Sequence, residues 1–84
     1  MVSTAANEAL GALGAAIRTL RIARGLTQER LAEAAGLHTT YVSDIERGLR
    51  NIGFVNLNRL AVALATDLPT LMREVEAHRG PNAD

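Results

Sequence analysis

The side chains that could form a functional site lie between residues 26 and 48, where short polar groups recur at helical spacing. Thr39, Thr40 and Ser43 occupy the outward positions of a helix predicted over 39–47. Short polar side chains at such positions can reach base edges in a DNA major groove without blocking entry of the helix. This pattern is typical of a surface that recognises a nucleic acid.

Catalysis is a weaker interpretation of the same residues. A nucleophile, a base and an orienting group would have to be Ser43, His38 and Asp44, all close together on one short exposed helix. A chain of 84 residues is too small to enclose a cleft around them. We assign His38 to a turn and His78 to the C-terminal tail, and with no cysteine a closed zinc site is not expected. We therefore expect no enzyme activity, no metal and no cofactor.

The formal net charge is zero, but the charges are unevenly distributed along the chain. Residues 18–59 carry seven arginines against four acids, whereas the rest of the chain carries two arginines against five acids. A basic middle can bind a polyanion locally, although scattered surface charge would give the same count. With one Tyr, one Phe and no Trp, stacking on single-stranded bases is disfavoured. We see no secretory signal and no membrane-spanning run, so we expect a cytoplasmic protein.

Apolar residues recur at helical spacing along most of the chain, which predicts an all-α fold of five short helices. The first carries its apolar stripe from Leu10, after a flexible segment over 1–7, and ends at Gly25. The second and third cover 27–35 and 39–47, and the fourth covers 54–65. The fifth follows Asp67 as its N-cap. One domain over 8–78 would then be followed by a tail over 79–84.

Residues 27–47 have the spacing of a helix-turn-helix motif, in which two short helices are joined by a tight turn. Small Ala32 and Ala35 allow the two helices to approach closely, and Gly36 makes the turn. Val42 and Ile45 would anchor the second helix in the core. An ordinary helical hairpin has the same spacing, so the residue identities must decide between the two interpretations.

The residue identities favour DNA binding, because this sequence resembles the Cro/phage-repressor (Xre-type) helix-turn-helix family. The resemblance extends from about Leu13 to Met72 and includes Arg-Gly-Leu-Thr-Gln-Glu, Ala-Gly-Leu and Tyr-Val-Ser-x-Ile-Glu-Arg-Gly. Residues 41–51 and 55–57 also look like the controller proteins of restriction–modification systems. The resemblance implies a lambda-repressor-like five-helix domain that binds double-stranded DNA as a dimer.

The resemblance also implies roles for individual residues. The positions expected to face bases are Thr39, Thr40, Ser43 and Arg50. The positions expected to contact phosphates are Gln28, Tyr41, Arg47 and Asn51. Arg21 and Glu46 would form an ion pair between the first and third helices, which would orient the recognition helix.

The sequence departs from the controller pattern in two places. His38 and Thr39 stand where many controller-like relatives carry Asp-Arg, so the third helix has a poor N-cap and lacks a long side chain that would read guanine. Gly53 stands where a serine often caps the fourth helix, and glycine is an acceptable substitute. Asp44 lies on the DNA side but would repel phosphate, so we assign it a tuning or solvent role.

A small core without disulfides or metal usually needs a second subunit, which predicts a homodimer. The apolar stripe of the fifth helix consists of Leu68, Leu71, Met72 and Val75. These residues either close the bundle or contact a second copy, and the resemblance favours a division between the two roles. We expect the dimer contact to use the fourth and fifth helices.

Together these observations predict a dimeric, autoregulatory transcription regulator on a near-palindromic operator. A restriction–modification controller is the leading subtype, and a phage-type or antitoxin-type repressor is the alternative. The chain leaves no room for a sensor domain, so no small-molecule ligand is expected. A protein-interaction adaptor without DNA binding stays open because the net charge is neutral, Asp44 faces the DNA side and position 39 lacks arginine.

Overall fold

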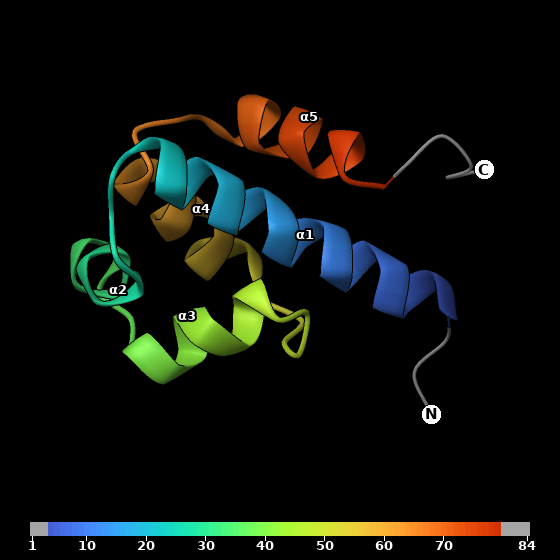
Figure 1. Cartoon of the computed structure of the whole chain (residues 1–84), viewed down its shortest axis with the longest axis horizontal. Helices are drawn as coiled ribbons and strands as arrows, with labels where there is room; N and C mark the ends of the chain where they lie inside the picture. The colour runs from blue at the N-terminus through green and yellow to red at the C-terminus, as the bar shows by residue number, and fades with distance from the viewer. Residues whose placement is uncertain (1–3, 80–84) are drawn as a thin grey trace.

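The five predicted helices are all present, and Figure 1 shows them in one bundle. The computed structural model describes residues 4–79, and this range contains no strand. The helices are α1 (Thr4–Ala23), α2 (Gln28–Ala35), α3 (Thr39–Glu46), α4 (Phe54–Ala63) and α5 (Leu68–Ala77). The all-α prediction is confirmed over these residues. Between residues 4 and 79, none of the helices has both the length and the apolar character needed to cross a membrane.

Several helix ends differ from the prediction by one or more residues, most clearly the start of α1 and the end of α4. α1 begins at Thr4, so residues 4–7 are helical rather than part of a flexible segment. Ala5 is the best helix-forming residue type, which explains how the helix extends ahead of its apolar stripe. α4 ends at Ala63, and Ala65 takes a left-handed backbone conformation with φ of 56°. Residues 1–3 and positions 80–84 of the predicted tail lie outside the described residues.

The helix-turn-helix motif has the capping that its sequence predicts. The Thr27 hydroxyl accepts a hydrogen bond of 3.0 Å from the Arg30 backbone N–H at the start of α2. Gly36 ends α2 with φ of 71°, in the left-handed region that glycine adopts without strain. His38 precedes α3 without a side-chain cap, so the position of α3 depends on its packing.

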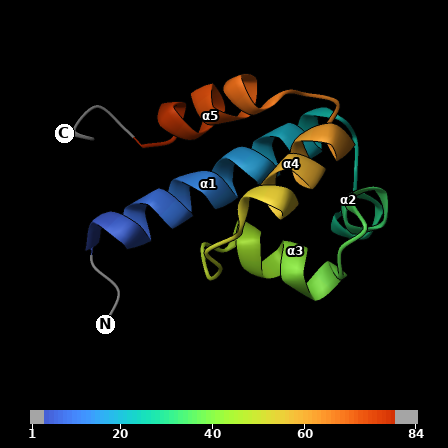
Figure 2. The same ribbon diagram turned by 180° about the vertical axis from the view of Figure 1, so that it is seen from behind.

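α1 is the central element of the bundle. It packs against α3 on one side and against α5 on the other, while α2 contacts both α3 and α4 (Figures 1 and 2). The core contains apolar side chains from all five helices. Its largest fully buried members are Ile17, Leu31, Val42, Ile45, Leu60, Leu64 and Leu71.

α1 lies very close to the end of α3 at Gly14. A methyl group at this position would overlap the carbonyl oxygen of Ile45 and lie 2.6 Å from that of Glu46. Only a glycine therefore allows the two helices to keep this separation. Gly14 lowers the helix propensity of α1, but it sets the position of the recognition helix.

Long-range polar contacts tie α1 to the helices that follow the motif. Arg24 donates hydrogen bonds of 2.8 Å to the Leu64 carbonyl and 3.1 Å to the Ala65 carbonyl, which satisfies the C-terminal end of α4. The assignment of His78 to a free tail is wrong. Its Nε2 lies 3.1 Å from Thr19 Oγ1 and 3.1 Å from Glu74 Oε2. Because α5 continues to Ala77, His78 caps that helix and its ring reaches α1.

Candidate DNA-binding surface

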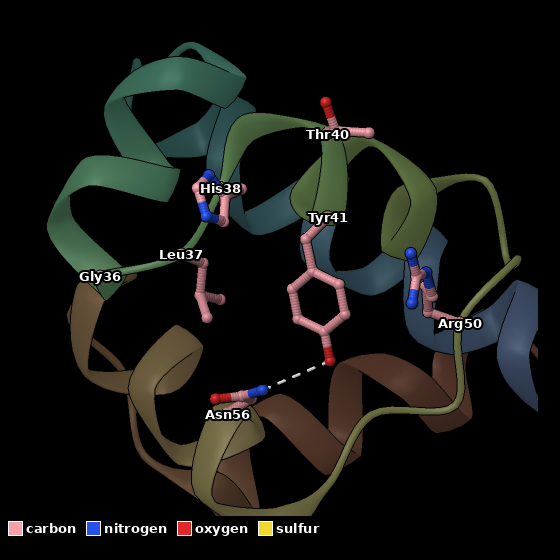
Figure 3. Close-up of a pocket in the computed structure, with 7 residues that line it drawn as sticks. All are labelled: Gly36, Leu37, His38, Thr40, Tyr41, Arg50 and Asn56. Carbon is pink, nitrogen blue, oxygen red and sulfur yellow. Dashed lines mark hydrogen bonds between the residues drawn. The ribbon is translucent and has the colours of Figure 1, made fainter.

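The exposed side of α3 presents the predicted base-facing residues. Thr39 and Thr40 are exposed in the first turn, and Ser43 is half-buried one turn later. Figure 3 shows the Thr40 side chain pointing away from the interior. On the opposite side of the helix, Val42 and Ile45 are fully buried. α3 is thus anchored by its apolar side and leaves short polar groups free to meet a groove.

A nearly buried polar cluster fixes the end of α3 against α1. Arg21 donates through Nε to Glu46 at 2.6 Å and through Nη2 to the other carboxylate oxygen at 3.0 Å. The Arg21 side chain is 12% exposed and that of Glu46 is 3% exposed. The hydrogen bond with Glu46 raises the pKa of Arg21, so this guanidinium is charged at every relevant pH. A two-pronged pair of this kind restricts both the rotation and the tilt of α3.

Gln28 belongs to the same cluster. Its amide nitrogen donates to Glu46 Oε1 at 3.0 Å, and Arg21 Nη1 donates to the Leu26 carbonyl at 2.9 Å. The Gln28 amide has a second N–H that this hydrogen bond does not use. Glu46 therefore orients Gln28 at the N-terminus of α2, where the predicted phosphate contact would form.

Two arginines predicted to contact DNA extend from the end of α3, and both bind Asp44. Arg47 Nη2 donates to Asp44 Oδ1 at 2.7 Å, and Arg50 Nε lies 3.4 Å from Asp44 Oδ2. The hydrogen bond from Arg47, assisted by Arg50, lowers the pKa of Asp44. The arginine side chains are 63% and 52% exposed, so their remaining N–H groups face solvent. Asn51 is exposed in the same loop.

Tyr41 joins α3 to the start of α4. Its hydroxyl accepts a hydrogen bond of 3.4 Å from Asn56, and the guanidinium carbon of Arg50 lies 5.3 Å from the centre of its ring. This distance is within the range of a cation–π interaction, which holds Arg50 over the ring face. Figure 3 shows these side chains around an open pocket of about 460 Å³. The pocket is lined by Gly36, Leu37, His38, Thr40, Tyr41, Arg50 and Asn56.

The sequence did not single out Asn56 or the pocket. Asn56 appears in a segment that resembles controller proteins, but its role depends on the tertiary approach of α4 to α3. The only signal in the sequence was that residues 55–57 match the same family as residues 41–51. Two segments that share a pattern and flank a loop are candidates for contact, and the hydrogen bond between Asn56 and Tyr41 is such a contact.

The apolar surface available to a partner lies mainly on α4. Phe54, Val55 and Val62 are 71%, 64% and 69% exposed, and their spacing puts them on one side of the helix. Among the residues predicted for the interface, Leu71 and Val75 are buried in the core of the single chain. Leu68 is half-buried, and Met72 is 38% exposed. The structure thus resolves the division between core and surface that the sequence left open.

Comparison with known proteins agrees with this geometry. The profile of the helix-turn-helix family matches residues 17–71, a range that runs from α1 to the middle of α5. The chain belongs to the helix-turn-helix family. It is a helix-turn-helix DNA-binding regulator that resembles the controller proteins of restriction–modification systems.

The helix-turn-helix chain is similar to controllers in both sequence and structure. Control protein C.SmaI from Serratia marcescens is 45% identical over 56 residues, which are 67% of this chain and 67% of that protein. The restriction–modification controller C.AhdI from Aeromonas hydrophila is 45% identical, with a TM-score of 0.72 over 74% of this chain and 94% of that one. The C.Esp1396I controller, solved as a tetramer with its natural 35 base-pair operator, is 28% identical, with a TM-score of 0.79 over 84% of this chain and 93% of that one.

These likenesses bear on the class of the helix-turn-helix chain as well as on its fold. The relatives are transcription regulators rather than enzymes. Of the three residues considered for catalysis, His38 is exposed just before α3, and Ser43 and Asp44 are half-buried on it. Within residues 4–79 no group of three metal-binding side chains gathers.

Proposed function

We propose that this protein is a dimeric transcription regulator that recognises a near-palindromic operator with α3. The observation that carries the proposal is the arrangement of α3 itself. Its apolar side is buried, its first turn exposes Thr39 and Thr40, and arginines 47 and 50 follow at its end. Short polar groups bordered by cations match a major groove, in which base edges lie between two rows of phosphates.

The residues on this surface divide into those that contact bases and those that contact phosphates. Thr39, Thr40 and Ser43 face bases, and Arg50 reaches a base from the loop. The residues that contact phosphates are Gln28, Tyr41, Arg47 and Asn51. Phosphate contacts supply most of the affinity and fix the register, while base contacts and groove shape determine the sequence that is bound.

A two-fold dimer sets the spacing of the operator. It places the two copies of α3 on half-sites separated by about 34 Å, one turn of DNA, or by a multiple of that distance. The exposed side of α4 is the surface that we assign to this dimer. The α4 side chains Phe54, Val55 and Val62 would be covered by their counterparts in the second copy, with Met72 at the border.

Within this class, the likeness to controller proteins supports a regulator that acts on its own operon. Such a protein is cytoplasmic and is found at the nucleoid when bound to DNA. A phage-type or antitoxin-type repressor has the same surface, and the neighbouring genes separate these possibilities. A methyltransferase and an endonuclease beside this gene would support the controller, whereas a toxin or prophage genes would contradict it.

Fluorescence anisotropy with DNA from immediately upstream of the gene tests the proposed function. A scrambled duplex of equal length is the control, and each duplex is measured at two salt concentrations. We expect much tighter binding to the upstream duplex, with an affinity that falls steeply with salt. A folded dimer that binds neither duplex would contradict the proposal and favour a protein-interaction adaptor.

Replacing Arg47 by alanine should weaken binding to every duplex by about tenfold and lower the salt slope by about one unit. The reason is that one phosphate contact, and the counterions it releases, are lost without any change in base contacts. The measurement is anisotropy over a salt series. Arg73→Ala on α5, which also removes one exposed arginine, should leave both quantities unchanged. An equal effect of the two variants would show that DNA affinity depends on the net charge of the protein rather than on a phosphate contact by Arg47.

Replacing Phe54 by aspartate should convert the dimer to a monomer at micromolar concentration, with dimer affinity reduced about thirtyfold or more. A large aromatic side chain is lost from the assigned interface, while an acid in the first turn of α4 suits the helix dipole. Sedimentation velocity measures the change. Leu49→Asp makes the same kind of substitution at 61% exposure outside α4 and should leave the dimer intact. If the Phe54→Asp protein stays dimeric, the exposed side of α4 is not the dimer interface.

A further inference from the structure

Asp44 occupies an unexpected place among the groups that face DNA. Its carboxylate uses one oxygen for Arg47, at 2.7 Å, and the other for Arg50, at 3.4 Å. The Asp44 side chain is 17% exposed, whereas both arginines are more than half exposed. The carboxylate is therefore mostly shielded from solvent while it binds both guanidinium groups, and each arginine side chain stays largely exposed.

The position of Asp44 opposes both helix stability and phosphate binding. An acid in the last turn of a helix is disfavoured by the helix dipole, and a carboxylate between two arginines that contact DNA repels the DNA backbone. The other acid in that turn, Glu46, is already bound by Arg21 and Gln28. The side-chain contacts of Asp44 are instead with Arg47 and Arg50, so its function concerns these two arginines.

Arg50 is held from two directions. Asp44 accepts from its Nε, and the Tyr41 ring lies under its guanidinium at 5.3 Å. Tyr41 is itself held by Asn56 of α4 at 3.4 Å. The Nη groups of Arg50 stay available, and they are the atoms that form a two-pronged contact with guanine or with phosphate.

We propose that Asp44 is a specificity-determining residue that competes with DNA phosphates for Arg47 and Arg50. This inference rests on the proposed function and deepens it. On DNA of any sequence, a phosphate gains an arginine only by displacing the carboxylate, so backbone contacts alone bind weakly. On the operator, Arg50 reaches a base through its Nη groups while its Nε stays on Asp44, so less of the carboxylate contact has to be given up. Asp44 therefore lowers nonspecific affinity more than operator affinity.

Asp44→Asn tests the proposal, because asparagine keeps the size of the side chain and removes its charge. We expect the variant to bind a scrambled duplex about tenfold more tightly, with a salt slope steeper by one to two units as freed arginines reach phosphates. Operator affinity should change much less, so the ratio of operator to scrambled affinity falls about tenfold. Glu76→Gln is the matched control, because it changes net charge equally on α5, away from α3.

Each outcome of this experiment decides between explanations. Equal tightening on both duplexes, or the same tightening with Glu76→Gln, would show a net-charge effect and overturn the proposal. Weaker binding of Asp44→Asn to the scrambled duplex would overturn it as well. If wild-type protein binds the operator and Asp44→Asn leaves the affinity ratio unchanged, this inference fails and the proposed function survives. If no variant binds any duplex, both fail together.

A measurement without DNA tests the contact itself. In ¹H–¹⁵N spectra of the free protein, the Arg50 Nε–H resonance should shift in Asp44→Asn and stay in place in Glu76→Gln. Nε is the atom that Asp44 contacts, so its resonance reports the loss of the carboxylate directly. An unchanged Arg50 resonance in Asp44→Asn would show that the carboxylate does not hold this arginine in solution, and would overturn the proposal.

Discussion

Replacing Arg21 by alanine should lower the free energy of unfolding by about 3 kcal/mol. The substitution leaves the Glu46 carboxylate, 3% exposed, without its cationic partner and without two hydrogen bonds. The Leu26 carbonyl also loses its donor. Since domains of this size are stable by only about 5–15 kcal/mol, the loss would be a large part of the total. Urea denaturation followed by circular dichroism measures the change.

Arg18→Ala is the control for this prediction, because Arg18 is an exposed arginine on the same helix. We expect it to change the free energy of unfolding by less than about 0.5 kcal/mol. A double variant with methionine at positions 21 and 46 should recover much of the stability lost in Arg21→Ala, because it removes both charges together. The explanation by an orphaned carboxylate would be wrong if Arg21→Ala were no less stable than Arg18→Ala.

The fold was predictable because its signals are local. The spacing of apolar residues gives the helices, and Thr27, Gly36 and Asp67 mark helix ends through hydrogen bonds or backbone angles that involve only their neighbours. α1 begins earlier than predicted because the helix extends beyond its apolar stripe. Alanines ahead of the stripe continue a helix without contributing to its packing.

The candidate site was predictable in its residue types but not in its contacts. Threonines on α3 and arginines at its end follow from the sequence, whereas the joint binding of Asp44 by Arg47 and Arg50 depends on the path of the loop after α3. The burial of Leu71 and Val75 likewise depends on how α5 packs against α1 and α4. Periodicity shows which residues share a face, but it does not show whether the same chain or a second copy covers that face.

Gly14→Ala should destabilise the protein by about 3 kcal/mol or more. At this position, helix propensity and tertiary packing predict opposite effects of alanine on stability. On helix propensity alone, alanine would stabilise α1 by up to about 1 kcal/mol. The added methyl group, however, would overlap the Ile45 carbonyl oxygen and lie 2.6 Å from that of Glu46. These are backbone atoms, so relief requires α1 and α3 to move apart. Thermal and urea denaturation measure the net effect.

Gly11→Ala separates the effect of helix propensity from that of steric overlap, because a methyl group at Gly11 meets no atom within 4 Å. On the same helix, we expect this variant to be more stable than the wild type by about 0.5–1 kcal/mol. Displacement of α3 in Gly14→Ala would also move Glu46 from Arg21, so DNA affinity should fall with stability even where the variant is folded. If both variants were stabilised, the close approach of α1 to α3 would not determine the position of the recognition helix.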